Sequence, residues 1–305
     1  MINHKIFIEK FQVPQAAVPY FSDWFSADEI SLVENIPSEI FTAREVAGLF
    51  PELDPAAFLS ACYRRGVVSV EEKASGTFRI SSFYGWMDIF VLTRKAEYDL
   101  LPKRAKEDLD QWYFDAFLQA VGAASSGTIP TADAIMPVEE VLAWIDGQAD
   151  RPVFLNFCDC RSLRGDCGMP TRTCITYKHG INTMADRGIA EPIDRERAKE
   201  VVRIAEKAGL MHTVNPNGIC NCCSDCCYLF RAQERLQSRG VWPATKTRIV
   251  FDADRCIGCG RCVKRCHFGV FSAAGRKITA DLDQCVGCGI CVSTCPVQVL
   301  HLEAR

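Results

Sequence analysis

Two runs of cysteines near the end of the chain constrain its fold more than any other feature. The first run has cysteines at positions 256, 259, 262 and 266, and the second at 285, 288, 291 and 295. Both follow the spacing C-x2-C-x2-C-x3-C and lie 29 residues apart. The segments that lead into them, residues 249–256 (IVFDADRC) and 278–285 (ITADLDQC), align at the same offset. A strand, a loop and a cysteine run therefore repeat as one unit.

The spacing within each run suits an iron–sulfur cluster. Three cysteines at three-residue steps let one tight loop wrap three corners of a cubane, and glycines at 258, 260, 287 and 289 let backbone amides approach its sulfides. A fourth ligand must come from elsewhere in the chain. Zinc knuckles are the alternative, but zinc sites usually pair two C-x2-C units across a longer spacer. The runs therefore predict two iron–sulfur clusters.

Residues 248–305 resemble the bacterial two-cluster ferredoxins, in which the fourth cysteine of each run ligates the other cluster. The resemblance implies two [4Fe–4S] clusters, one held by Cys256, Cys259, Cys262 and Cys295, and the other by Cys285, Cys288, Cys291 and Cys266. One position departs from the family. The proline that follows the fourth cysteine is present as Pro296, but the first run has His267 there. We expect His267 to change the surroundings of one cluster without preventing ligation.

The middle of the chain holds nine further cysteines that the ferredoxin pattern does not need. They form two groups in the sequence, Cys158, Cys160, Cys167 and Cys174, and then Cys220, Cys222, Cys223, Cys226 and Cys227. Such clustering favours metal ligation over a disulfide framework, and a reducing compartment over a secreted setting. A helix predicted over residues 198–210 would bring the second group back to the first.

Three interpretations of these nine cysteines remain open. They are a further iron–sulfur centre with ligands from both groups, a structural Zn²⁺ site with four cysteine ligands, and redox-active vicinal thiols. Arg161, beside Cys160, either donates hydrogen bonds toward a cluster or is solvated. His179 and His212 are nearby candidate ligands or proton donors.

From about residue 138 onward, the chain resembles a group of iron–sulfur proteins from anaerobic microbes. The resemblance is carried by a CxC-R segment, a GL-x-H-x-x-N stretch, an ICNCC-x2-CC run and the ferredoxin-like end. It implies an architecture and an anaerobic setting but no particular reaction. The paired cysteines also resemble the cysteine-rich modules of heterodisulfide reductases, although the CCG tripeptide of those modules is absent.

The N-terminal part resembles a winged helix. Helices are predicted after Ser26, Thr42 and Asp54, each a suitable N-cap, and two strands flank residues 73–76. The helix after Asp54 presents mainly Ala, Phe, Leu and Ser, and the charges over residues 42–80 cancel. Nucleic-acid binding is therefore less expected than a docking or structural role. Cys62 on this helix is expected to be a buried hydrophobe.

These features predict an α+β protein with three parts. We expect a winged-helix-like and helical domain over residues 1–121, a loop-rich cysteine module with helices over 132–247, and a ferredoxin-like domain with a pseudo-two-fold repeat over 248–305. Residues 122–131 have the composition of a linker. The chain shows neither a secretory leader nor an apolar run of the roughly 20 residues that a membrane span needs, so a cytoplasmic location is expected.

The expected chemistry is one-electron transfer between redox partner proteins. The sequence shows no nucleotide-binding glycine loop after a strand and no recognisable Ser/His/Asp arrangement. An electron carrier or electron-transfer subunit is therefore favoured over an enzyme that works alone. A reductase whose middle module carries an active-site cluster is the alternative, and a DNA-binding redox sensor is the second.

Overall fold

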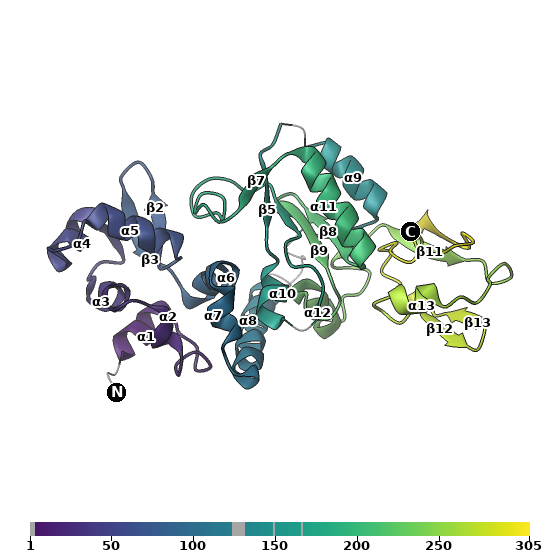
Figure 1. Cartoon of the computed structure of the whole chain (residues 1–305), viewed down its shortest axis with the longest axis horizontal. Helices are drawn as coiled ribbons and strands as arrows, with labels where there is room; N and C mark the ends of the chain where they lie inside the picture. The colour runs from purple at the N-terminus through teal and green to yellow at the C-terminus, as the bar shows by residue number, and fades with distance from the viewer. Residues whose placement is uncertain (1–3, 124–131, 149, 166) are drawn as a thin grey trace. The chain divides into compact units, whose positions relative to one another are not determined.

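The computed structural model describes residues 4–123, 132–148, 150–165 and 167–305 (Figure 1). With 40% helix and 19% strand it is an α+β protein, as predicted. The chain divides into two compact units. The first comprises residues 1–117, 162–164 and 179–191, and the second comprises 118–161, 165–178 and 192–305. Most of the predicted linker, residues 124–131, lies outside the described residues.

The first unit begins with an aromatic core. Helices α1 (Lys5–Phe11), α2 (Phe21–Trp24), α3 (Ala27–Asn35) and α6 (Phe83–Thr93) contribute to it. The rings of Trp86 and Phe90 stack with centroids 4.6 Å apart, and Phe25 lies 4.5 Å from Trp86. Helix α3 begins at the predicted cap, because the side chain of Ser26 accepts a hydrogen bond from the Glu29 amide and Glu29 bonds the Ser26 amide in return.

The predicted order of helix, turn, helix and hairpin is present in the first unit. It consists of β1 (Ile40–Thr42), α4 (Ala43–Leu49), α5 (Pro55–Arg64), β2 (Val68–Glu72) and β3 (Thr77–Ile80). The strands form an antiparallel sheet in the order β1-β3-β2. Asp54 caps α5 by accepting from the amides of Ala56 and Ala57, and Cys62 is buried. Helices α7 (Lys95–Asp99) and α8 (Lys103–Ala123) follow.

Two segments from the middle of the sequence also pack in the first unit. The hydroxyl of Tyr98 donates to the carbonyl of Leu163 at 2.8 Å. The side-chain amide of Asn182 makes two 2.8 Å hydrogen bonds with the backbone of Val70. The guanidinium of Arg187 lies 4.2 Å from the ring centre of Tyr63. No sequence pattern indicated that residues 162–164 and 179–191 would pack in this unit.

A seven-stranded sheet forms the centre of the second unit, in the order β10-β4-β8-β9-β6-β5-β7. Its strands are β4 (Ala134–Met136), β5 (Val153–Asn156), β6 (Cys174–Thr176), β7 (Glu191–Ile193), β8 (Met211–Asn215), β9 (Gly218–Cys222) and β10 (Ala244–Thr245). Strand β5 leads the chain directly toward Cys158. The sheet as a whole was not foreseen in a module expected to be rich in loops.

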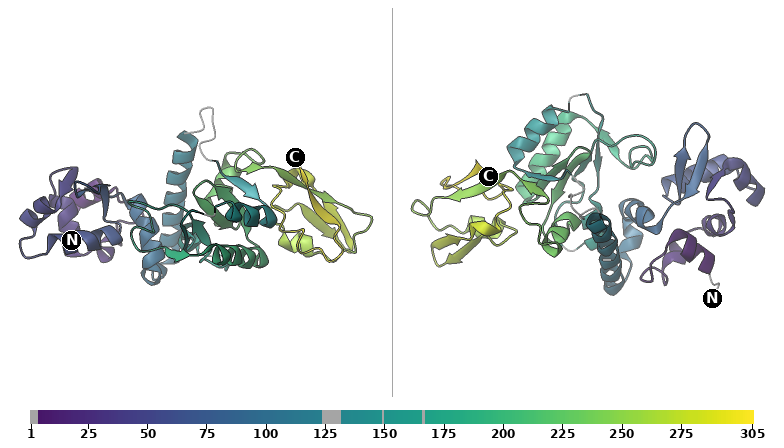
Figure 2. Two further views of the ribbon diagram at one scale, coloured as in Figure 1. Left: turned by 90° about the horizontal axis from the view of Figure 1, so that it is seen from above. Right: turned by 180° about the vertical axis from the view of Figure 1, so that it is seen from behind.

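Helices α9 (Val138–Asp146) and α11 (Arg195–Ala208) lie side by side against this sheet (Figures 1 and 2). Their apolar side chains join those of the strands in one buried core that includes Val141, Ile145, Leu155, Val202 and Ile219. Two shorter helices, α10 (Asp159–Arg164) and α12 (Tyr228–Arg235), begin directly after cysteines. The sheet and α10 therefore carry four of the nine middle cysteines, and Cys158 and Cys227 directly precede the two short helices.

The 29-residue repeat is visible in the last part of the second unit. Strand β11 (Thr247–Phe251) pairs with β14 (Leu300–Ala304), and β12 (Phe271–Ala274) pairs with β13 (Lys277–Ala280). The opening strand of each repeat is therefore paired with the closing strand of the other. Helix α13 (Arg261–Arg265) and the short 3-10 helix η1 (Leu282–Gln284) complete this part.

Gly218 lies where β9 packs closely against β6, the two strands that carry Cys174, Cys220 and Cys222. A Cβ at Gly218 would lie 2.4 Å from the carbonyl oxygen of Ile175 on the neighbouring strand β6. We expect Gly218→Ala to force these strands apart and to destabilise the second unit by about 1–3 kcal/mol, measured as a lower thermal midpoint by circular dichroism. Gly48→Ala is the control, because Gly48 lies in α4 with open space around it. Equal midpoints for wild type and Gly218→Ala would contradict this account.

Candidate metal centres

Two small cavities in the last part of the chain are each lined by four cysteines. One is lined by Cys256, Cys259, Cys262 and Cys295, and the other by Cys266, Cys285, Cys288 and Cys291. Each set combines three cysteines of one run with the fourth of the other, as in the ligand sets that the resemblance implied. Among the described residues, no three of these eight sulfurs lie within 4.8 Å of one another. The four sulfurs of each set are therefore too far apart to bind one ion together, which suits a cluster with a thiolate at each corner.

The backbone around both cavities is shaped by glycine. Gly258 and Gly287 have φ values of +69° and +68°, and a Cβ on either would lie about 2 Å from a carbonyl oxygen, at 1.9 Å from Arg276 and 2.1 Å from Thr247. In this conformation the amide of Gly258 donates to the sulfur of Cys256 at 3.5 Å, and the amide of Gly287 donates to Cys285 at 3.3 Å. Such bonds stabilise a thiolate and help to set the potential of a cluster.

The two cavities differ in their access to solvent. Cys259 is exposed and the neighbouring Ile257 is 48% exposed, so the first cavity lies near the surface. At the second cavity Cys285 and Cys291 are buried. Burial raises the pKa of Cys288 to about 12 and also raises the pKa of Cys291. The raised pKa values favour the protonated thiols, so metal binding at this cavity would release protons.

Six of the nine middle cysteines form one linked group, which we call the six-cysteine group. Each of its thiols shifts the pKa of the next, in the order Cys174, Cys220, Cys222, Cys227, Cys160 and Cys158, so the six lie close together. The contact with Cys174 is the main cause that lowers the pKa of Cys220, whereas the same contact raises the pKa of Cys174. Cys222 and Cys227 are buried and Cys220 is exposed.

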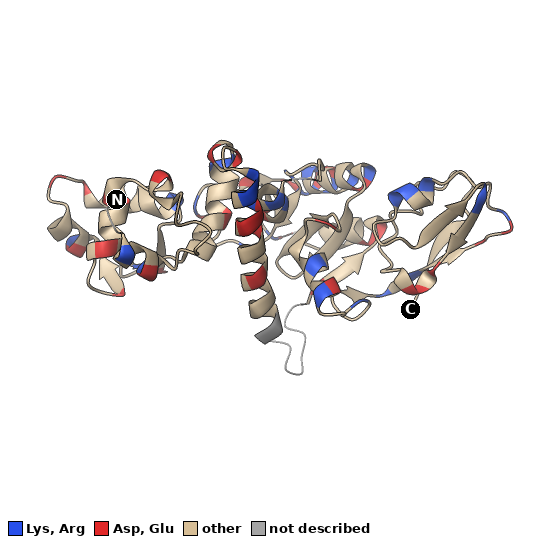
Figure 3. Ribbon diagram, turned by 90° about the horizontal axis from the view of Figure 1, so that it is seen from below, with Lys and Arg blue, Asp and Glu red and all other residues tan. Residues whose placement is uncertain are grey.

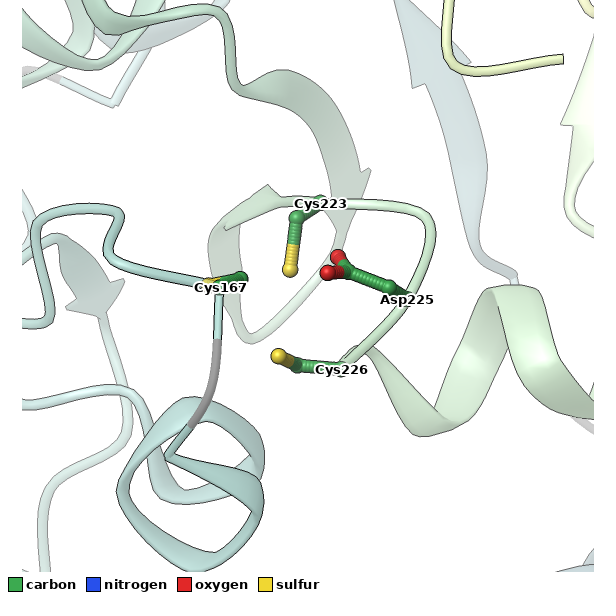
Figure 4. Close-up of side chains that lie close together, drawn as sticks. All are labelled: Cys167, Cys223, Asp225 and Cys226. Atoms are coloured by element: carbon green, nitrogen blue, oxygen red, sulfur yellow. The ribbon is translucent and has the colours of Figure 1, made fainter.

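The other three middle cysteines form a separate and tighter group. The sulfurs of Cys167, Cys223 and Cys226 and a carboxylate oxygen of Asp225 all lie within 4.8 Å of one another (Figure 4). Both spatial groups draw cysteines from both sequence groups, so neighbours in the sequence were a poor guide to neighbours in space. The sequence analysis did not identify Asp225 as a candidate ligand, although Asp225 lies within the C-x2-C spacing of Cys223 and Cys226.

Arg161 is not solvated, because it is only 2% exposed. Its guanidinium donates to the carbonyls of Pro170 at 3.0 Å and Asn221 at 2.6 Å, and to the hydroxyl of Thr173 at 2.5 Å. Burial acts to lower the pKa of Arg161, but the nearby sulfurs of Cys158, Cys222 and Cys223 outweigh it and raise the pKa. Arg161 therefore places a buried positive charge beside both groups of thiols.

The two candidate histidines do not join these groups. His212 is fully buried, and its ring nitrogens contact Asn221 Oδ1 at 2.6 Å and Glu206 Oε2 at 3.2 Å, so both nitrogens are already engaged. The other oxygen of Glu206 accepts from the hydroxyl of Ser293, in the second cysteine run, at 2.8 Å. His179 is exposed and belongs to the segment that packs in the first unit. His212 thus supports the strands rather than binding metal.

The six-cysteine group and the second cavity meet in one apolar cluster. Cys222, Cys227 and Phe230 from the middle of the chain pack there with Val286 and Ile290, and Cys288 lies against the same cluster. The buried cavity is therefore the one that adjoins the middle cysteines.

His267, the residue that departs from the ferredoxin pattern, makes two contacts that proline could not make. Its Nε2 lies 2.7 Å from the carbonyl oxygen of Gly209, and its Nδ1 lies 3.3 Å from the hydroxyl of Ser224. Ser224 stands between Cys223 and Asp225 in the tight group. His267 therefore ties the first cysteine run to the middle of the chain.

Comparison with known proteins identifies the class of the last part. Residues 249–302 match a family described as a 4Fe-4S dicluster domain. Residues 249–302 are therefore a ferredoxin-type domain, which together with the many cysteines supports an iron–sulfur electron-transfer role. No curated protein matches the chain. None of the helices in the described ranges is long and apolar enough to cross a membrane.

Substitution of Arg161 tests whether its buried guanidinium stabilises the second unit and the metal binding of the middle cysteines. We expect Arg161→Lys to keep the charge but lose the planar set of donors, and so to lower the stability of the second unit by at least about 2 kcal/mol. The variant should also lose metal faster to a chelator. Arg203→Lys, on the exposed face of α11, is the matched control. An Arg161→Lys protein with the metal content and thermal midpoint of the wild type would show that the buried guanidinium is dispensable.

Proposed function

We propose that this protein passes single electrons through two [4Fe–4S] clusters and a further iron–sulfur centre. One cluster is held by Cys256, Cys259, Cys262 and Cys295, and the other by Cys266, Cys285, Cys288 and Cys291. The observation that carries this proposal is the pair of cavities, each lined by one of these sets. When bound, such clusters supply reversible one-electron oxidation and reduction.

The six-cysteine group is the proposed site of the further iron–sulfur centre. Among the described residues no four of its sulfurs lie within 4.8 Å of one another, so the group does not offer one ion a complete tetrahedral shell. Six neighbouring thiols are more than one four-coordinate ion can bind, which favours a centre with several irons. Arg161 would offset the negative charge of the thiolates there.

The contacts of the chain support an order for electron transfer. A redox partner would approach at Cys259 and Ile257, where the first cavity lies near the surface. The second cavity lies deeper and shares the apolar cluster of Phe230 and Val286 with the middle cysteines. Exclusion of water by this cluster lowers the local dielectric constant. The hydrogen bonds from the amides of Gly258 and Gly287 to cysteine sulfurs favour the reduced, more negative state of a centre.

The N-terminal segment of residues 40–80 is proposed as a winged-helix-like docking element. The support is its order of helices followed by a hairpin in a three-stranded sheet. Charges of both signs are interleaved within this segment, where Arg79 pairs with Glu71, and also along the later helix α8 (Figure 3). Mixed charges of this kind suit a protein partner better than a phosphate backbone.

A reductase is the second candidate, and the exposure of Cys220 favours it. A cysteine of the six-cysteine group that reaches the surface would let a small acceptor approach the proposed centre. In that case electrons would pass through the ferredoxin-type domain to the acceptor. Turnover of a small disulfide by the protein alone would distinguish this function from electron carriage.

The carrier function is tested by counting electrons. We expect the anaerobic full chain, once photoreduced, to return at least two electrons to a one-electron acceptor, because each proposed cluster stores one. Cys262→Ser and Cys291→Ser should each alter the electron paramagnetic resonance spectrum of the reduced protein. Cys62→Ser is the control, since Cys62 is buried in α5 of the first unit. A wild-type chain that stores no electrons, or spectra unchanged in both ligand variants, would rule the proposal out.

A further inference from the structure

The tight group of Cys167, Cys223, Asp225 and Cys226 differs in geometry from every other set of cysteines in the described chain. It is the one set that brings four potential ligand atoms within 4.8 Å of one another. From this geometry we propose that these four residues bind a single Zn²⁺ ion, at a site separate from the iron–sulfur centres. The site adds a carboxylate ligand that the cysteine pattern alone did not indicate.

The spacing of the ligand atoms distinguishes one ion from a cluster. A tetrahedral Zn²⁺ ion has Zn–S bonds of about 2.3 Å, which places bound sulfurs about 3.8 Å apart. In a cubane, each thiolate binds a different iron, so the sulfurs are separated by the width of the cluster. The tight group fits the first case. The eight cysteines of the two cavities fit a cluster, because no three of the sulfurs of these described residues lie within 4.8 Å of one another.

The chemistry and direction of the side chains agree with zinc. Zinc accepts thiolates together with one aspartate oxygen in a four-coordinate shell. Asp225 is exposed as a residue, yet its carboxylate turns toward the sulfurs of Cys223 and Cys226 (Figure 4). Cys223 and Cys226 themselves are buried against Ala205 and Leu210. An exposed aspartate therefore closes a site whose thiolates are shielded.

The site joins distant parts of the chain. Cys167 follows α10, whereas the other three ligands lie on the turn between β9 and α12 (Figure 4). The same turn carries Ser224, whose hydroxyl contacts His267 beside Cys266. A bound ion would therefore fix the turn that holds the first cysteine run of the ferredoxin-type domain. Its role would be structural rather than redox, because Zn²⁺ does not change its oxidation state.

Zinc analysis of the full chain tests the proposal. Anaerobically purified protein should contain one zinc per chain in addition to its iron, and absorption at the zinc edge should show three sulfurs at about 2.3 Å and one oxygen at about 2.0–2.2 Å. Asp225→Asn keeps the shape of the side chain and removes its charge. It should weaken zinc binding about tenfold or more in competition with a chelator, because loss of even an outer partner of a ligand costs about 10–100-fold.

Two further variants make the result decisive. Cys226→Ser should lose zinc but keep the iron content of the wild type, while Ser224→Ala, on the same turn but not a proposed ligand, should keep its zinc. Zinc bound by four sulfurs, or zinc that is unaffected by Asp225→Asn, would overturn the assignment. Protein without zinc whose iron content falls in Cys226→Ser would place these cysteines in an iron–sulfur centre instead. Neither outcome would affect the clusters proposed for residues 249–302, so the two proposals fail independently.

Discussion

The arrangement of the middle cysteines depends on the buried guanidinium of Arg161. A buried cation is unfavourable unless hydrogen bonds and negative charges surround it. Arg161 donates to two carbonyls and a hydroxyl, which fix its position between β9 and the loop before β6. Negative charge on the nearby Cys158, Cys222 and Cys223 would favour this cation and raises the pKa of Arg161. The cation in turn acts to lower the pKa of Cys158, although Cys160 and burial raise that pKa overall.

A second set of interactions connects this centre to the ferredoxin-type domain. The backbone of Asn221 accepts from Arg161, and its side chain contacts His212, which reaches Ser293 through Glu206. His267 contacts Gly209 and Ser224 from the other cysteine run. Both cysteine runs are therefore held to the middle of the chain by buried or half-buried polar contacts. Departure from the ferredoxin pattern at His267 has a structural reason, since proline at this position would offer no side-chain hydrogen bond.

The sequence predicted local features better than distant contacts. The caps of α3 at Ser26 and of α5 at Asp54 follow from side chains that bond the backbone next to them, and α11 ends before Gly209, which adopts the left-handed conformation. The two cavities are lined by the cysteine sets that the ferredoxin resemblance implied, whereas the spacing within each run left the source of the fourth ligand open. The seven-stranded sheet was missed because strands of two to five residues leave little periodic pattern. The division of the middle cysteines into groups of six and three was hidden because it depends on that sheet.

The central claim is that the middle cysteines extend an iron–sulfur electron path beyond the two clusters of the ferredoxin-type domain. Mössbauer spectroscopy of the full chain, isolated anaerobically from cells grown on ⁵⁷Fe and combined with iron and acid-labile sulfide analysis, tests it most directly. The account predicts more than eight irons per chain, with sulfide in similar excess and a spectral component distinct from the two [4Fe–4S] clusters. Eight irons in two cubane clusters, with nothing further, would contradict it and leave the six-cysteine group without an iron–sulfur role.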